Sequence, residues 1–513
     1  MIILILAFIG IGMGLLLWFL KERPARPVWQ TAMVGAAVFW LLLLINGPTD
    51  EAFMHPGWQV TPGQILYFEF ALPSETWAVA VVLTGLFLFR LLTIGGESQP
   101  EAARNLPAVF GLLGVSLLAI GASNPLTLVL TWTLFDTGFF IWEAAQGRPP
   151  SRGFILGMGS VLLLMMGSIL DIGAFGETGA LLQAPIRSSE LIILFAAGLR
   201  FLSSVSWGDD STSALQAPFS DLPAMLSGGL AFLVLVQFAP FSGLSPALLT
   251  VSAGILCVLG IISSLAVEGG QTVLRRMNWP YAALVLGILT LPSVVQSSLL
   301  ASVGGLWALK VVFQRLAFVF AGWQRWGTIL FPLAQCGLPF ALGSALLSAS
   351  IFAEGSSVPV QLIILFSMLT AAVNLWRRWD GVRLEAYEPD RFTIFLQVSS
   401  SAILLFLVIY TGVQLGSSFR WEAAIAAGVL AGPSFLLTRA LQKNPIILDP
   451  TSVGLERTTI QLKRSSKVLV NGIRWVYDYG VGFASDIVEG SGGTLWIIVI
   501  LLMLVIGLRN LGA

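Results

Sequence analysis

Long apolar stretches alternate with short polar ones along almost the whole chain. A transmembrane helix needs about 20 mostly apolar residues, and counting runs of roughly 17–25 such residues gives about sixteen candidate spans. These spans cover residues 1–20, 28–46, 74–94, 105–122, 125–145, 152–171, 189–206, 222–240, 246–266, 280–297, 299–322, 328–350, 357–377, 390–413, 421–440 and 494–510. Because the runs are continuous and do not alternate residue by residue, they predict an all-α polytopic membrane protein and exclude a β-barrel.

The positive residues between the spans predict the orientation. Lys21, Arg23 and Arg26 follow the first span, and most other loops after odd-numbered spans are also basic. Loops after even-numbered spans hold mainly acids, such as Asp50 and Glu51. Since Lys and Arg accumulate on the cytoplasmic side, the odd loops face inward and both termini are expected outside.

Two segments depart from the pattern of helix and short loop. Residues 47–75 form an outside loop whose apolar stretch Ile65–Phe70 is expected at the membrane interface. Residues 442–493 read either as an amphipathic helix along the membrane surface or as a tether without a partner. We therefore divide the chain into helices 1–3 (1–104), helices 4–8 (105–240), helices 9–13 (246–377), helices 14–15 (378–441), this interfacial segment (442–493) and a C-terminal helix (494–513).

Composition narrows the possible chemistry. The chain is 56% hydrophobic and 11% charged with no net charge, which supports a lipid bilayer as partner and gives no sign of a nucleic-acid partner. Cys257 and Cys336 lie inside apolar spans and are expected to be packing residues, and His55 is the one histidine. We find no phosphate loop or nucleophile–base pair in the sequence, so we predict no cofactor and no catalytic or redox site.

An acid and a base lie near the middle of two apolar spans. Asp136 is central in the span at 125–145, and Arg200 is central in the span at 189–206. A carboxylate at that depth costs about 2.5–3.5 kcal/mol on insertion scales, so such residues usually face the bundle interior and form a pair or a pathway. Glu143 shares the helix face of Asp136 because it lies two turns further along.

The pair of Asp136 and Arg200 allows two interpretations. One is a proton or cation relay in which Asp136 titrates. The other is a fixed ion pair that holds two helices in register. Arginine does not lose its proton in proteins, which favours the fixed pair.

Lys310 is a stronger candidate for proton exchange. It lies within the span at 299–322, followed by Gln314 one turn later and Arg315 beside it. A lysine shielded from water releases its proton more readily than one in water, so Lys310 can exchange protons. Arg315 is nearer the inner end and is expected to extend toward the interface. The candidate ion-path residues are therefore Asp136, Arg200, Lys310, Glu143, Gln314 and Arg315.

Seven stretches in order give the chain a family resemblance. It resembles the antiporter-like subunits of respiratory complex I (NADH:quinone oxidoreductase) and of Mrp-type cation/proton antiporters. The similar stretches are Ser123–Ala145 with Arg152–Met166, Ala196–Trp207 with Ala217–Leu230, Leu274–Leu286, Leu306–Gly322 and Gly337–Gly343. The resemblance implies that residues 105–240 and 246–377 are two inverted five-helix repeats.

The chain departs from the family pattern at the ionisable positions. The family's glutamate directly follows a tryptophan, whereas here Thr133 follows Trp132 and the acid is Asp136. Arg200 matches the family's lysine of the seventh helix. Lys310 falls near the histidine of helix eleven and Arg315 near its lysine, while the eighth-helix and twelfth-helix charges have no counterpart. The chain reads as a divergent member with altered or impaired conduction.

The resemblance implies a membrane subunit of a complex I-like or Mrp-like assembly, associated with translocation of protons or monovalent cations. Its partners would be other membrane subunits, and its location the cell (inner) membrane. Two alternatives stay open: a structural subunit whose ion path is inactive, and an unrelated secondary transporter.

Overall fold

The computed structural model describes residues 2–54, 58–61, 64–66, 68–94, 100–145, 152–174, 187–206, 221–239, 241, 244–265, 278–315, 328–352, 357–380, 391–415 and 421–443. The chain divides into two units, and the larger one, Met1–Gly57 with Tyr67–Lys443, holds all of the described helices. The predicted interfacial segment at 442–493 and the last span lie outside the described residues, apart from the end of one helix.

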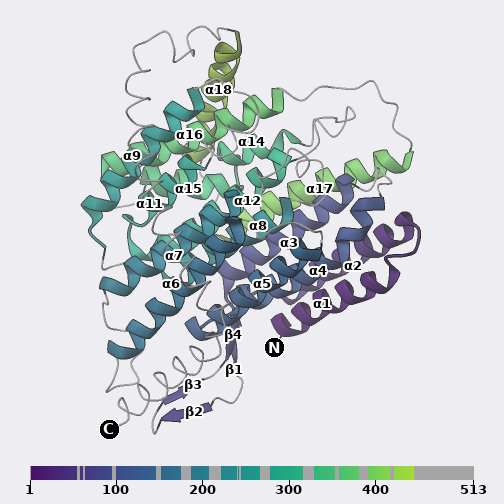
Figure 1. The fold of residues 1–513 in the computed structure, drawn as a ribbon. Helices are drawn as coiled ribbons and strands as arrows, with labels where there is room; N and C mark the ends of the chain where they lie inside the picture. The colour runs from purple at the N-terminus through teal and green to yellow at the C-terminus, as the bar shows by residue number, and fades with distance from the viewer. Residues whose placement is uncertain are drawn as a thin grey trace. The chain divides into compact units, whose positions relative to one another are not determined.

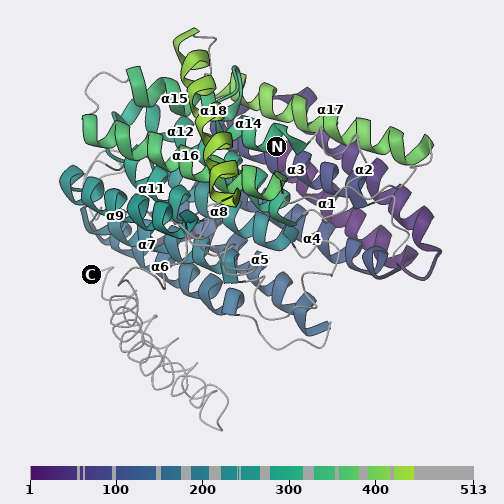
Figure 2. The same ribbon diagram turned by 90° about the horizontal axis from the view of Figure 1, so that it is seen from above.

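The first half of the larger unit contains nine helices among its described residues (Figure 1). They are α1 (Ile2–Leu20), α2 (Ala25–Asn46), α3 (Ser74–Ile94), α4 (Pro100–Gly121), α5 (Pro125–Ala145), α6 (Arg152–Ala174), α7 (Arg187–Ser206), α8 (Asp221–Phe238) and α9 (Pro246–Leu265). α6 and α7 run side by side, as both views show (Figure 1 and Figure 2).

The second half continues with seven described helices. They are α11 (Trp279–Ile288), α12 (Ser293–Arg315), α14 (Leu330–Gln335), α15 (Leu342–Phe352), α16 (Val358–Asp380), α17 (Arg391–Gln414) and α18 (Trp421–Lys443). In lipid every backbone N–H and C=O must be bonded within the protein, and helices achieve this within one segment.

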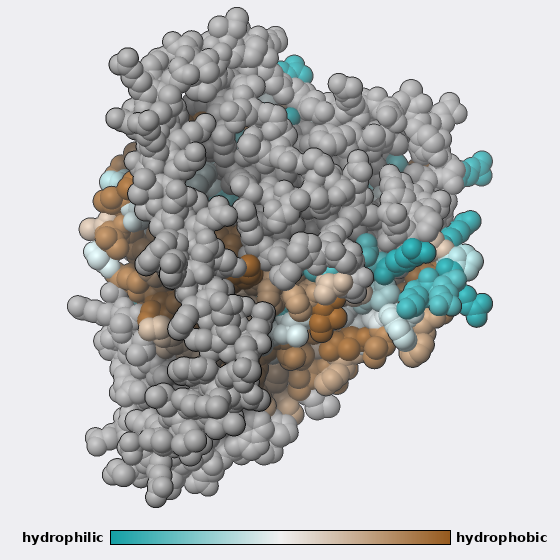
Figure 3. All heavy atoms as spheres, viewed as in Figure 1, coloured by the Kyte–Doolittle hydropathy of each residue, from teal (hydrophilic) through white to brown (hydrophobic). Residues whose placement is uncertain are grey.

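The described residues support a polytopic membrane protein. Eight of the described helices are long and apolar enough to cross a bilayer, and five shorter helices are also apolar. Phe8, Phe19, Ile45, Leu134 and Ile141 are each more than half exposed, as lipid-facing side chains would be. Figure 3 shows hydrophobic residues over much of the described surface on one face, with hydrophilic residues gathered toward one end.

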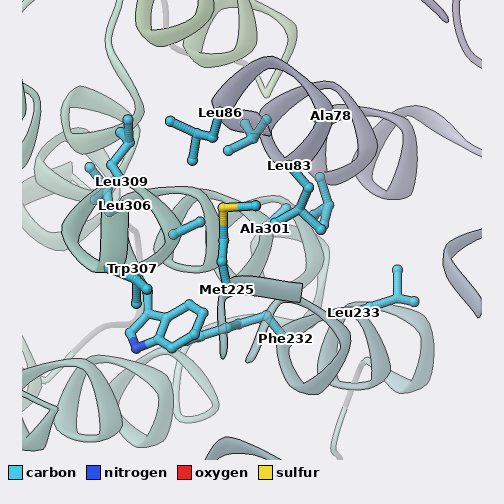
Figure 4. Packing of buried hydrophobic residues seen from close by; sticks show 14 of the residues in the cluster. Ala78, Leu83, Leu86, Met225, Phe232, Leu233, Ala301, Leu306, Trp307 and Leu309 are labelled. Atoms are coloured by element: carbon cyan, nitrogen blue, oxygen red, sulfur yellow. The ribbon is translucent and has the colours of Figure 1, made fainter. Parts of the chain in front are cut away.

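α3 forms the centre of the bundle. In its apolar part 89% of the residues are buried, against 33% in α1. It packs against α17, α12, α2 and α8. Figure 4 shows Leu83 and Leu86 of α3 meeting Met225 of α8 and Leu306 of α12 in this core.

The loop between α2 and α3 contains strands that the sequence analysis did not predict. In the larger unit, β1 (Thr49–Met54) pairs antiparallel with β4 (Glu69–Leu72). The N–H of Ser123 donates to the carbonyl of Glu69 at 3.0 Å, which ties β4 to the start of α5. In the smaller unit, β2 (Trp58–Thr61) pairs antiparallel with β3 (Gln64–Leu66).

One predicted boundary in the second half is wrong. The sequence analysis placed spans at 280–297 and 299–322, but α11 ends at Ile288 and α12 already begins at Ser293. Pro292 disfavours a helical residue before it. The side-chain amide of Gln296 donates to the carbonyls of Leu289 and Leu291 at 3.2 and 2.8 Å, which stabilises the turn.

The predicted span at 328–350 is also wrong as a single helix, because it consists of α14 and α15 with a turn between them. Gly337 has a φ of +88°, a conformation that glycine adopts without steric cost. Its N–H donates to the carbonyl of Ala334, and the next N–H, of Leu338, donates to that of Leu333. This pattern is a Schellman C-cap, which ends α14 within the apolar run.

Candidate functional site

Asp136 of α5 and Arg200 of α7 form a buried ion pair. Nη1 of Arg200 donates to Oδ2 of Asp136 at 2.6 Å, and both side chains have an exposed fraction of 0%. The sequence analysis named these residues as partners, and the structure confirms the pairing. The attraction between the two charges offsets part of the large cost of removing each from water.

Aromatic rings and a glycine surround this pair. The guanidinium of Arg200 lies over the rings of Trp132 and Phe135, at 4.7 and 5.2 Å from their centroids. A Cβ added at Gly157 of α6 would lie 2.9 Å from Oδ1 of Asp136, so the pair occupies the space that a side chain there would fill. Because it has no side chain, Gly157 makes room for the two charges.

The pair uses only part of its hydrogen-bonding capacity. Oδ1 of Asp136, Nε and Nη2 of Arg200, and Nε1 of Trp132 are buried and have no hydrogen-bond partner among the described residues. A single hydrogen bond therefore joins two groups that can each form several. The aromatic rings and the ion pair together fix Arg200 in position.

Lys310 of α12 forms a second buried polar site. Its exposed fraction is 3%, and its Nζ donates to the side-chain oxygen of Asn278, just before α11. The same oxygen accepts a 3.2 Å hydrogen bond from Nε1 of Trp307. The ammonium group also lies 5.5 Å from the ring centroid of Tyr281, a cation–π distance. The contacts of this lysine thus include a neutral amide and an aromatic ring.

The second site extends to the break between α14 and α15. The hydroxyl of Tyr281 donates to Oε1 of Gln335, the last residue of α14, at 2.9 Å. Nε2 of Gln335 is buried without a hydrogen-bond partner among the described residues. Polar side chains therefore connect Lys310 to the place where the helix is interrupted.

The structure describes fewer contacts for the other three predicted residues, Glu143, Gln314 and Arg315. Glu143 is buried on α5, two turns after Asp136. Gln314 and Arg315 are the last two residues of α12, and their side chains lie outside the described part of the structure. Whether any of the six residues carries an ion stays a prediction.

Sequence reasoning missed four members of the second site: Asn278, Tyr281, Trp307 and Gln335. None carries a charge, so none stood out in an apolar run. Trp307 precedes Lys310 by three residues and so shares its helix face, which was a usable signal. Asn278 and Tyr281 lie in a stretch that the family resemblance covered, but nothing there pointed to Lys310.

Comparison with known proteins begins with the sequence. No family model matches it. One similar curated protein is the probable potassium transport system protein Kup of Cutibacterium acnes (strain DSM 16379 / KPA171202), 24% identical over 253 residues. The match covers 47% of this chain and 38% of that protein, so the chain spans well under half of that relative.

Solved structures give a broader likeness. A chain of the Mrp complex from Dietzia sp. DQ12-45-1b superposes with a TM-score of 0.62 at 12% identity, covering all of this chain and 63% of that one. A chain of the membrane-bound sulfane sulfur reductase, an archaeal respiratory membrane complex, gives 0.60 at 13%, covering 98% and 99%. A chain of respiratory complex I from Thermus thermophilus gives 0.56 at 15%, covering 84% and 99%. The chain therefore has the polytopic, antiporter-like fold that its sequence predicted.

Proposed function

We propose that the chain is an antiporter-like membrane subunit of a complex I-like or Mrp-like assembly, and that it takes part in moving protons or monovalent cations. The observation that carries the proposal is Lys310, buried in this fold and hydrogen-bonded to a neutral amide. Ionisable residues inside membrane helices are rare and commonly belong to ion pathways.

The two polar sites suit different roles. Arg200 does not release its proton, so the Asp136–Arg200 pair supplies fixed charges and does not carry protons itself. Lys310 can switch between charged and neutral forms when shielded from water. The Asn278 oxygen accepts a hydrogen bond from either form, because both an ammonium and an amine carry N–H groups. Proton exchange is therefore assigned to the second half of the bundle.

The assembly and the orientation belong to the same proposal. Chains of similar fold occur in multi-subunit membrane complexes, which supports other membrane subunits as partners. We assign the chain to the cell (inner) membrane with both termini outside, as the loop charges predict. The likeness to Kup, a probable potassium transport protein, adds K⁺ to the ions worth measuring.

The test is ion flux in vesicles that contain the whole assembly. Lys310→Ala should abolish most of the proton or K⁺ flux, and Asp136→Asn should reduce it. Lys21→Ala is the matched control, because Lys21 is an exposed lysine in the turn after α1, and it should leave the flux unchanged. Wild-type flux in both site variants would contradict the proposal.

A structural subunit with an inactive path is the second candidate. The fixed Asp136–Arg200 pair favours it, since that contact joins α5 and α7 without needing to titrate. This candidate predicts that both variants keep full flux and weaken assembly instead. An unrelated secondary transporter would instead move its ion as a purified chain, without partner subunits.

A further inference from the structure

α7 separates the two polar sites. Arg200 points toward α5 and α6, where it meets Asp136 and the space beside Gly157. Phe201, the next residue, contacts Trp307 of α12, with 5.5 Å between ring centroids. Consecutive helical residues point about 100° apart, so one turn of α7 presents a charge to one side and an aromatic ring to the other.

Three aromatic rings, which we call the aromatic partition, lie between the sites: Phe201, Phe232 and Trp307. Their centroids are 5.7 Å apart for Phe201 and Phe232, and 5.8 Å apart for Phe232 and Trp307. Figure 4 shows Trp307 and Phe232 side by side within the apolar core, with Met225 above them. Water is excluded from such a layer because it offers no hydrogen-bonding groups.

Trp307 is held at both ends of its indole ring. Nε1 is held by the Asn278 oxygen, the same atom that accepts the hydrogen bond from Lys310. A Cβ at Gly228 of α8 would overlap the far end of the indole ring, so this ring lies directly against the helix backbone. Its position therefore depends both on Gly228 and on the partner of the lysine.

We infer that the aromatic partition is a hydrophobic barrier between the Asp136–Arg200 pair and the Lys310 site, and that Trp307 closes it. Hydrophobic constrictions block ions by excluding water. Lys310 and Trp307 both donate to the side-chain oxygen of Asn278, so a change in the charge of Lys310 alters how strongly this oxygen holds the indole ring. That ions cross this barrier rests on the proposed function. That the barrier excludes water does not rest on it.

The first test measures access of water to the partition. Ser203 of α7 and Ser227 of α8 are buried with their hydroxyl oxygens 3.2 Å apart, and Ser227 precedes Gly228. In the full assembly carrying Cys257→Ala and Cys336→Ala, Ser203→Cys should resist a water-soluble methanethiosulfonate reagent. Adding Trp307→Ala should make this cysteine react.

A size-complementing pair covers the case in which Trp307→Ala fails to assemble. Gly228→Ala alone should displace the indole and expose the cysteine at position 203. Gly228→Ala with Trp307→Phe should protect it again, because the smaller ring leaves room for the new methyl group. Trp77→Ala is the control: Trp77 is equally buried and donates its Nε1 hydrogen to the carbonyl of Leu43 at 3.0 Å.

The outcomes separate the barrier from the proposed function. Labelling with Trp307→Ala but not with Trp77→Ala supports the barrier, whether or not the assembly moves ions. A severalfold higher passive proton leak in Trp307→Ala supports both the barrier and the proposed function. An unreactive cysteine in Trp307→Ala, or equal labelling with Trp77→Ala, overturns the barrier. Equal labelling of Gly228→Ala and of Gly228→Ala with Trp307→Phe overturns the role of Trp307. These conclusions do not depend on whether Lys310→Ala abolishes ion flux.

Discussion

The two buried polar sites differ in how their positive charge is held. Arg200 is joined to the carboxylate of Asp136 and covered by Trp132 and Phe135. Lys310 donates to the neutral amide of Asn278, beside the ring of Tyr281. An ion pair loses much of its energy when either partner is neutralised, whereas an amide can bond a lysine in both forms. We therefore expect the charge of Arg200 to stay fixed and the charge of Lys310 to change.

The largest expected effect is on the first site. Arg200→Met leaves Asp136 as an uncompensated buried charge, which should lower the free energy of unfolding by about 3–5 kcal/mol. Denaturant titration of the assembly measures this. Asp136→Leu combined with Arg200→Met should recover most of the loss, and a double variant as unstable as the single one would show that the pair is not the cause.

Gly157→Ala should have the next largest effect. The added Cβ would lie 2.9 Å from Oδ1 and 3.1 Å from Oδ2 of Asp136, so the pair must shift, and overpacking of this kind costs about 1–3 kcal/mol. Denaturant titration of the assembly measures this loss of stability as well. Gly159→Ala is the control on the same helix, where the new Cβ meets only Leu199 at an ordinary 3.7 Å. Equal losses in the two variants would contradict the tight fit around the charges.

The smallest effect on stability is expected at the second site, with a large effect on function. Asn278→Asp replaces the amide that bonds Lys310 with a carboxylate, the kind of group that bonds Arg200 in the first site. The free energy of unfolding should change by less than about 1 kcal/mol, because a new ion pair and its desolvation nearly cancel. Proton flux should fall, because the lysine would then keep its proton. Unchanged proton flux in Asn278→Asp would contradict the claim that Lys310 exchanges protons while Arg200 does not.

Charge was the feature that the sequence revealed best. Asp136 and Arg200 stood out because each is costly in lipid, and the pairing follows from that cost. Tyr281, Trp307 and Gln335 did not stand out, since their polar atoms matter only through contacts between helices far apart in sequence. The turn at Gly337 was hidden by apolar residues on both sides, so hydropathy predicted one span where two helices lie. The inverted repeat and the outside termini stay predictions.

The central claim is that Lys310 exchanges protons while Arg200 holds a fixed charge. Proton flux through the vesicle-embedded assembly, measured for Lys310→Arg and Arg200→Lys, tests it most directly. Both variants keep the positive charge, but arginine does not release its proton. The account predicts that Lys310→Arg loses most of the flux and Arg200→Lys keeps it. Full flux with Lys310→Arg, or its loss only with Arg200→Lys, would contradict it.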